Sequence, residues 1–285
     1  MLLASIISLG ILGLIFGGGL AYASRRFAVK VDPRISEVED VLPGANCAAC
    51  GCIGCSAFAE APVLGNVSCN GCVPGGADVA RKVAEILGVE AEEKIPVMAV
   101  VRCRGDRENA RERFRYQGVM DCRAALLTGG GAKACAYGCL GLGSCAAACP
   151  FDAITMSELG LPVVDEQKCT GCGVCVATCP RGIMELIPRT QKVYLGCVSH
   201  DKTKAVKAVC DVGCIGCGLC SRPKITPSGA VRMEDNLPVL PSDWSDTETA
   251  VEKCPSKIFV VRDTAATGPE SAPCASVSNP LGCTV

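Results

Sequence analysis

The strongest chemical signal in this sequence is a run of four cysteines followed by a proline. The run reads Cys169-x2-Cys172-x2-Cys175-x3-Cys179-Pro180, in a chain of 285 residues with 24 cysteines. This spacing lets three thiolates wrap around one 4Fe–4S cubane, while the fourth cysteine turns away and serves a neighbouring cluster. Structural zinc sites use two separated knuckles instead, so a four-cysteine zinc site is the weaker interpretation.

A partner motif lies upstream, as the crossing cysteine requires. In Cys135-x3-Cys139-x5-Cys145-x3-Cys149, Leu142 stands where the run would have its second cysteine. Cys135 is positioned to replace it, although Cys122 competes for this role and the sequence leaves the choice open. The two predicted ligand sets are Cys135, Cys139, Cys145 and Cys179 for one cluster, and Cys149, Cys169, Cys172 and Cys175 for the other.

A third motif keeps one cysteine triple and lacks the second. No Cys-Pro follows within a few residues of the triple that ends at Cys220, where the chain reads Ser221-Arg222-Pro223. Cys254-Pro255 comes later and has no triple before it, only Asp243-Trp244-Ser245-Asp246. One triple and the cysteine that crosses to it are therefore both missing, which predicts the loss of one whole cluster. The predicted ligands of the remaining cluster are Cys214, Cys217, Cys220 and Cys254.

An internal repeat connects these motifs. Lys133-Ala-x3-Gly138-Cys139-Leu-Gly141 resembles Lys207-Ala-x4-Gly213-Cys214-Ile-Gly216. Cys103 and Cys197 each follow a short apolar stretch at matching places, so we expect them to share a structural role. The chain is thus an array of cysteine units, each too small to fold without its cofactor.

The N-terminus indicates the compartment. Residues 1–24 carry no charged side chain, and Arg25, Arg26 and Lys30 follow them. As a helix this stretch would span about 36 Å, enough for a hydrocarbon core of about 30 Å. A secretory signal places its positive charge before the apolar run, so a single-pass anchor is favoured over a cleaved signal. The positive-inside rule then predicts an inner (cytoplasmic) membrane protein with its N-terminus outside and its thiolates on the cytoplasmic side.

The first cysteine group, Cys47-x2-Cys50-x4-Cys55-x16-Cys72, also contains Cys52 and Cys69, so counting does not identify its ligands. The chain resembles the B subunit of the Rnf complex, a membrane ferredoxin:NAD oxidoreductase that pumps ions. The resemblance is carried by the apolar anchor, the segment Gly44-Ala-Asn-Cys-Ala-Ala-Cys-Gly51, the segment Cys72-x-Pro-Gly-Gly and the tandem motifs. The resemblance extends to about residue 262. It implies that Cys47, Cys50, Cys55 and Cys72 hold the first cluster. Cys52, where an aromatic residue is usual, the added Cys69 and the lost cluster depart from the family pattern.

Together with the three clusters predicted from the motifs, the cluster implied by the resemblance makes four predicted 4Fe–4S clusters. The resemblance also implies reduced ferredoxin, the membrane and the other membrane subunits of the complex as partners. NAD reduction and ion movement would belong to those other subunits. We expect electrons to enter at the tandem ferredoxin-like units and to leave from the first cluster. The alternatives are a tethered electron-transfer or storage module of another membrane redox complex and a zinc-structured interaction protein.

Composition excludes several other classes of function. A single His makes catalysis by several imidazoles untenable, and a net charge of −1 provides no basic field for nucleic acid. Gly141-Leu-Gly143-Ser-Cys-Ala146 matches a dinucleotide fingerprint, but no strand precedes it, so we predict neither flavin nor NAD in this chain. The chain is predicted to relay electrons without a bond-making active site, which leaves no catalytic residues.

We predict an α+β fold with tandem bacterial ferredoxin-like (βαβ pseudo-twofold) units. A helix is expected at 77–88, a strand at 95–101 and a charged helix at 105–116. The arginines of that last helix would either attract an acidic ferredoxin or form a solvated face. The predicted domains are a transmembrane anchor (1–28), a small 4Fe–4S domain (29–94), a two-cluster ferredoxin-like domain (95–190), a single-cluster ferredoxin-like domain (191–262) and a disordered tail (263–285).

Overall fold

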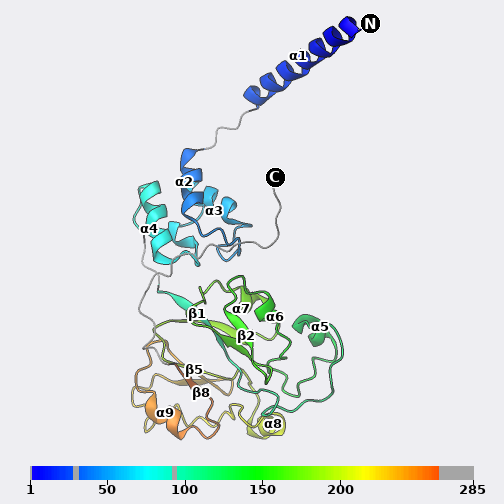
Figure 1. The fold of residues 1–285 in the computed structure, drawn as a ribbon. Coiled ribbons are helices and arrows are strands. Elements are labelled where there is room, and N and C mark those ends of the chain that lie inside the picture. Colours follow the sequence, from blue (N-terminus) through cyan, green and yellow to red (C-terminus); the bar gives the residue numbers. More distant parts are fainter. Residues whose placement is uncertain (1, 28–31, 92–94, 263–285) are drawn as a thin grey trace.

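The computed structural model describes residues 2–27, 32–91 and 95–262 (Figure 1). The predicted tail at 263–285 lies outside these residues. The chain begins with α1 (Leu2–Arg26) and continues into an N-terminal domain of helices, here residues 32–91. Two strand-containing units follow, which we call unit 1 (residues 95–190) and unit 2 (residues 191–262).

Helix α1 exposes most of its described apolar side chains; Leu9, Leu14 and Leu20 are each more than 70% exposed, at 72%, 79% and 72%. Within the described part of the chain, however, no helix reaches the length and mean hydropathy of a membrane-crossing segment. The structure therefore does not support the transmembrane helix predicted for residues 1–28.

The N-terminal domain packs three helices and a short 3₁₀ turn around one core. They are α2 (Pro33–Val41), α3 (Cys55–Val63), the turn η1 (Cys69–Gly71) and α4 (Gly76–Leu87). Val38, Phe58 and Val83 are almost completely buried between them. The helix predicted at 77–88 is confirmed as α4, and Gly88 ends it in the left-handed conformation, with φ of 68°, that a C-terminal cap requires.

Unit 1 is closed by its first and last strands. β1 (Val97–Val101) pairs antiparallel with β4 (Met184–Pro188), which confirms the strand predicted at 95–101. Between them lies a hairpin of β2 (Ile154–Met156) and β3 (Pro162–Val164). Short helices in the connecting loops are α5 (Cys122–Leu127), α6 (Ser144–Ala147) and α7 (Val174–Thr178).

Unit 2 repeats this plan. β5 (Val193–Leu195) pairs antiparallel with β8 (Phe259–Val261), and β6 (Arg232–Glu234) forms a hairpin with β7 (Leu237–Val239). Its helices are α8 (Thr203–Val209) and α9 (Glu248–Lys253). All of these strand pairs are antiparallel, unlike a strict βαβ crossover, which pairs its strands in parallel. The repeat itself is present as predicted.

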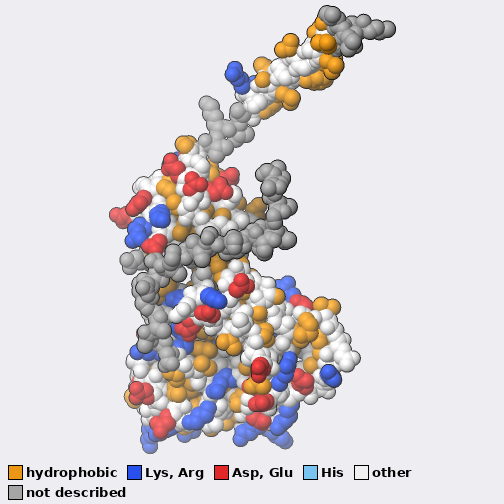
Figure 2. Space-filling model, in the orientation of Figure 1, with side chains coloured by type: hydrophobic (Ala, Val, Ile, Leu, Met, Phe, Trp, Pro, Cys, Tyr) orange, Lys and Arg blue, Asp and Glu red, His pale blue; other side chains and the backbone are white. Residues whose placement is uncertain are grey.

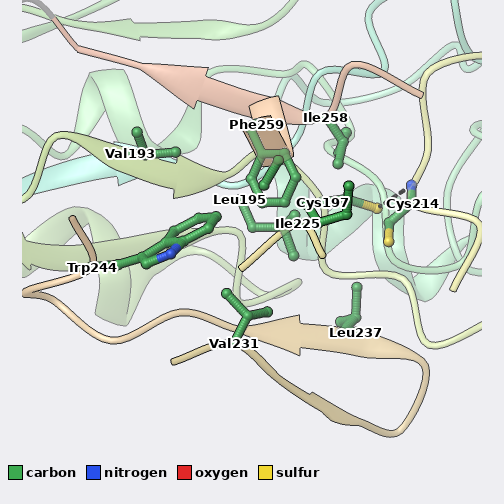
Figure 3. Packing of buried hydrophobic residues seen from close by; sticks show 11 residues of the cluster. Val193, Leu195, Cys197, Cys214, Ile225, Val231, Leu237, Trp244, Ile258 and Phe259 are labelled. Carbon is green, nitrogen blue, oxygen red and sulfur yellow. Dashed lines mark hydrogen bonds between the residues drawn. The ribbon is translucent and has the colours of Figure 1, made fainter. Parts of the chain in front are cut away.

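The core of unit 2 includes Trp244, which lies at one side of the cluster of buried side chains (Figure 3). The indole packs edge-on against Phe259, with ring centroids 5.7 Å apart and planes at 60°. Leu195, Ile225 and Val231 are buried in the same cluster, which also contains Cys214.

The charged helix predicted at 105–116 is wrong. The segment is irregular and forms only isolated β-bridges, from Ala110 to Cys210 and from Glu112 to Lys133. Its arginines are occupied by other parts of the fold: Arg111 Nη1 donates 2.8 Å to the Lys207 carbonyl, and Arg113 Nη2 donates 2.8 Å to the Gly129 carbonyl. These bonds hold the segment against other loops, so it does not form a helix.

Candidate iron–sulfur centres

Every cysteine in the described part of the chain is a free thiol. Within the described residues, no group of three or more His, Cys, Asp or Glu side chains is arranged to hold a single metal ion. The thiols instead gather in sets of four, and several of these sets line hollows that are partly open to solvent. We number the hollows 1 to 4 and describe each from the elements that build it.

Hollow 1 contains about 310 Å³ of empty space and lies beside β1. The backbone N–H of Ala99 donates to Cys169 Sγ at 3.4 Å. Gly171 has φ of +73°, and a Cβ there would lie 2.5 Å from the Val97 carbonyl oxygen, so only glycine lets the cysteine loop pack on the strand. The four thiols at this hollow are a set predicted from the sequence: Cys149, Cys169, Cys172 and Cys175.

Hollow 2 contains about 400 Å³ of empty space between α5, α6 and the end of α7. Asp121 caps α5 by accepting the N–H of Ala124 at 2.8 Å, and it also accepts the hydroxyl of Ser144 at 2.9 Å. The N–H of Cys122 donates to that same hydroxyl at 2.8 Å, which ties α5 to α6. The thiols that line hollow 2 are those of Cys122, Cys139, Cys145 and Cys179.

The structure thus differs from the preferred sequence assignment at one position, because Cys135 does not line hollow 2. Cys122 lines it, which is the alternative that the sequence leaves open. The physical reason is the tie between α5 and α6, since it brings Cys122 beside the loop in which Leu142 replaces a cysteine.

Hollow 3 lies in unit 2 and contains about 410 Å³ of empty space. Ile215, Ile225 and Phe259 are among the apolar residues around it. Cys217 is the only exposed cysteine in the part of the chain that the structure describes. The thiols of hollow 3 are the predicted set: Cys214, Cys217, Cys220 and Cys254.

The N-terminal domain brings together the thiols that the family resemblance implies. Burial raises the pKa of the Cys72 thiol, and the nearby thiols of Cys55, Cys50 and Cys47 add to the rise. Asn46 Oδ1 accepts the N–H of Cys55 at 2.8 Å, which holds the start of α3 against the first cysteine loop.

The two other cysteines of the N-terminal domain lie differently. Cys52 packs against the same core. Burial raises the pKa of its thiol, and the nearby thiol of Cys50 adds to the rise. Cys69 points to other partners, with its Sγ 3.7 Å from Asn70 Oδ1 and 4.0 Å from the Glu90 carbonyl.

Burial raises the pKa of several thiols at the hollows. It is the main cause that raises the pKa of Cys139, Cys175 and Cys214 to about 12 and that of Cys220 to about 11. Buried thiols ionise when a positive charge lies beside them, and iron supplies such a charge. Sets of four soft sulfur ligands in mostly apolar surroundings therefore fit iron–sulfur clusters.

A further set of thiols is not predicted as a group by the sequence. Cys135 lies in hollow 4, which contains about 430 Å³ of empty space between the two units. The signal that could have found this group is the repeat, in which Cys103 matches Cys197 and Cys135 matches Cys210. The thiols of hollow 4 are those of Cys103, Cys135, Cys197 and Cys210.

Neighbouring sets lie close enough to influence one another. Burial is the main cause of the raised pKa of Cys172, but the thiol of Cys47 in the N-terminal domain adds to it. In the same way, Cys145 of hollow 2 adds to the rise in the pKa of Cys175 of hollow 1. The thiol sets of the N-terminal domain, hollow 1 and hollow 2 therefore follow one another in space.

Two families of protein domain match the chain at these sites. The family described as a 4Fe-4S dicluster domain matches residues 134–183, which include most of the thiols of hollows 1 and 2. The family described as a putative Fe-S cluster matches residues 42–74 and so covers the cysteine group of the N-terminal domain.

Curated relatives match most of the chain. The B subunit of the ion-translocating oxidoreductase complex of Methanosarcina acetivorans is 42% identical over 263 residues, which cover 92% of this chain and 99% of the relative. The B subunit of the proton-translocating ferredoxin:NAD(+) oxidoreductase complex of Clostridium ljungdahlii is 46% identical over 250 residues, 86% of this chain and 87% of the relative.

The B subunit of the Na(+)-translocating ferredoxin:NAD(+) oxidoreductase complex of Acetobacterium woodii is 47% identical over 206 residues. That match covers 72% of this chain and 62% of the relative's length. The resemblance seen in the cysteine motifs is thereby confirmed, and the chain belongs to the family of B subunits of ion-translocating oxidoreductase complexes, the Rnf B subunits.

Proposed function

We propose that this chain is the iron–sulfur electron-transfer subunit of an ion-translocating ferredoxin:NAD oxidoreductase. The observation that carries the proposal is the succession of four-thiol sets from the N-terminal domain into unit 2. When bound at these sets, 4Fe–4S clusters supply one-electron redox chemistry. The proposed ligands are Cys47, Cys50, Cys55 and Cys72 in the N-terminal domain, together with the thiols of hollows 1, 2 and 3.

The chain's own contribution is to hold the sulfurs and to set the charge around them. The backbone N–H of Ala99 donates to Cys169 Sγ, and that of Ile183 donates to Cys179 Sγ, each at 3.4 Å. Donors of this kind favour the more negative, reduced state of a site and so raise its reduction potential. Apolar walls such as Ile225 and Phe259 at hollow 3 limit the access of water.

Ferredoxin is proposed to dock on unit 2, beside hollow 3. This is where the exposed cysteine, Cys217, lies. Helix α8 is attached to the same loop, because the hydroxyl of Thr203 donates to the Ile215 carbonyl at 2.8 Å. Lys204 and Lys207 of α8 are exposed, so they offer an acidic partner positive charge next to this thiol set.

Helix α1 is proposed to attach the chain to the membrane complex. The apolar side chains that the structure describes on it, from Ile6 to Leu20, are exposed (Figure 2), and Arg25 and Arg26 follow them. Contiguous apolar surface of this kind is a site for contact with lipid or with another membrane protein. The topology expected from the charge order stays a prediction. Deleting residues 2–26 should move the chain from the membrane fraction to the supernatant and abolish its co-purification with membrane subunits.

The proposed direction of electron flow is tested by separating uptake from delivery. In the assembled complex, Cys55→Ser should stop NAD reduction, while reduced ferredoxin still bleaches the visible absorbance of the remaining centres. Cys69→Ser is the matched control, because Cys69 lies in the same domain but faces Asn70 and Glu90. Full NAD reduction by Cys55→Ser, or no bleaching of the wild-type chain by reduced ferredoxin, would contradict the proposal.

A further inference from the structure

Of the four thiols of hollow 4, only Cys135 belongs to a ligand set predicted from the sequence, and the structure places it here and not at hollow 2. We propose that Cys103, Cys135, Cys197 and Cys210 bind an additional 4Fe–4S cluster between unit 1 and unit 2. The inference rests on the proposed function, because it assigns to hollow 4 the cofactor proposed for the neighbouring hollows. The cluster would be shared by the two units, with two ligands from each.

The ligands come from equivalent places in the repeat. Cys103 follows β1 and Cys197 follows β5, at the same distance from the end of each strand. The same backbone contact is made twice: the N–H of Cys139 donates to Cys103 Sγ at 3.4 Å, and the N–H of Cys214 donates to Cys197 Sγ at 3.4 Å. Such N–H donors to sulfur are typical of ligated cysteines, and their repetition indicates one arrangement built from both units.

The thiols of the two units lie close together beside the backbone of Gly105. A Cβ added at Gly105 would lie 3.2 Å from Cys210 Sγ and 3.8 Å from Cys103 Sγ, so glycine leaves room for both sulfurs. Cys135, Cys197 and Cys210 are 9%, 9% and 8% exposed. The empty space of about 430 Å³ is similar to the 400 Å³ and 410 Å³ of hollows 2 and 3.

A buried positive charge lies in the same hollow. Lys133 lines hollow 4, is only 6% exposed, and donates its ammonium to the Gly105 carbonyl. Among the ion pairs of the described residues, none involves Lys133. The carboxylate of Asp106 lies near enough for Lys133 to help lower its pKa, although the two form no ion pair. A buried ammonium that no carboxylate contacts directly is costly. A cubane held by four thiolates carries net negative charge and would offset that cost.

The position of hollow 4 completes the succession of thiol sets. On one side, Cys103 accepts the N–H of Cys139, which lines hollow 2. On the other side, Cys197 accepts the N–H of Cys214, which lines hollow 3. Hollow 4 therefore stands between the two-cluster unit and the single-cluster unit, where a redox group would join them.

The test counts iron and acid-labile sulfide in the anaerobically purified full chain. We expect about twenty of each per chain, against about sixteen if hollow 4 is empty. Cys197→Ser and Cys210→Ser should each lose about four of each and keep the rest, while Cys69→Ser, a buried cysteine outside all the hollows, should lose none. A wild-type count of about sixteen, or zinc in place of the additional iron, overturns the inference.

The wild-type count needs no variant, so it decides the inference even if a serine variant fails to fold. A second measurement uses a variant that keeps all four thiols. Lys133→Met removes the buried ammonium, so it should lower the reduction potential of one centre in an EPR-monitored titration and leave the iron count unchanged. An unaltered set of potentials contradicts the assignment. Failure of ferredoxin to reduce a chain that contains twenty irons would instead count against the proposed function alone.

Discussion

Units 1 and 2 share one framework, yet they fill one half of it differently. In unit 1 the loop after β3 leads to Cys169 and Cys175, which line hollow 1. In unit 2 the corresponding positions after β7 hold Trp244 and Ala250, both of which are buried in the hydrophobic core. Cys179 and Cys254 then end equivalent helices, α7 and α9, in extended backbone.

The difference teaches that an iron–sulfur site and an aromatic core can serve the same structural purpose. Both bring the hairpin, the closing strands and the last short helix of a unit into contact. Where thiols surround the space, the unit depends on its cofactor; where an indole fills it, ordinary burial supplies the stability. Unit 2 thus keeps hollow 3 on one side and a hydrophobic core on the other.

The largest expected effect comes from removing the side chain that replaces the lost cluster. Trp244→Ala should destabilise unit 2 by about 3–5 kcal/mol, because it leaves a cavity against Phe259 and its neighbours. Urea unfolding followed by circular dichroism measures the loss. Trp244→Phe retains an aromatic ring and should cost clearly less. Equal stability of Trp244→Ala and wild type would break the comparison between the two units.

The loops that carry the cysteines should respond alike in both units. Gly171→Ala places a Cβ 2.5 Å from the Val97 carbonyl, and Gly216→Ala places one 3.0 Å from Asn236, both at positive φ. We expect each to cost about 2–4 kcal/mol. Gly182→Ala is the control, since it has φ of +61° but nothing within 4 Å, and should cost about 1–2 kcal/mol. Thermal unfolding of the three variants decides whether contact or backbone strain dominates.

The ion pair that joins the units should make stability depend on pH. Arg262, of unit 2, has a nearly buried side chain and donates to Glu166, of unit 1, at 2.7 and 2.8 Å. The hydrogen bond from Arg262 lowers the pKa of Glu166 below 4.5. The pair therefore stabilises the fold above that pH, and its contribution is lost as the pH falls through the lowered pKa.

Glu166→Gln should cost about 2 kcal/mol at neutral pH. The gap to wild type should close as the pH falls below the ordinary glutamate range, which urea unfolding at a series of pH values measures. Glu158→Gln, an exposed residue in the same unit, should leave stability unchanged at every pH. A constant gap for Glu166→Gln across the series would show that packing, not charge, joins the units there.

The smallest expected effect concerns which unit meets ferredoxin. Lys204→Glu, beside hollow 3, should slow reduction by ferredoxin several-fold at low salt and little at high salt. Arg115→Glu tests unit 1 in the same way and should have less effect. Stopped-flow reduction at two ionic strengths separates them. The reverse order would move the docking site to the arginine-rich segment of unit 1.

Short-range spacing predicts most of the candidate site. The triple at Cys169, Cys172 and Cys175 lies within one loop, so its spacing alone indicates hollow 1. The absence of a cysteine triple around Trp244 indicates that this half of unit 2 is not lined by thiols, and the structure has a hydrophobic core there. Spacing does not predict that Cys122 lines hollow 2. This residue lies on α5, whose position depends on the contact between Asp121 and Ser144.

Contacts between distant segments account for what the sequence does not predict. Hollow 4 takes thiols from both units, so no local spacing reveals it, although the repeat contains the matching positions. The helix expected at 105–116 is absent because carbonyl groups far along the chain, such as that of Lys207, bind its arginines. Charge patterns predict helices only where such competing partners are missing.

The buried indole of unit 2 also gives the molecule an optical reporter. Trp244 is the chain's single tryptophan, and it lies in a core cluster that includes Cys214. Its fluorescence therefore reports on unit 2 and on no other part of the chain. A light-absorbing cluster at hollow 3 would quench this fluorescence. The rate at which the fluorescence recovers would therefore measure how fast hollow 3 loses its cluster.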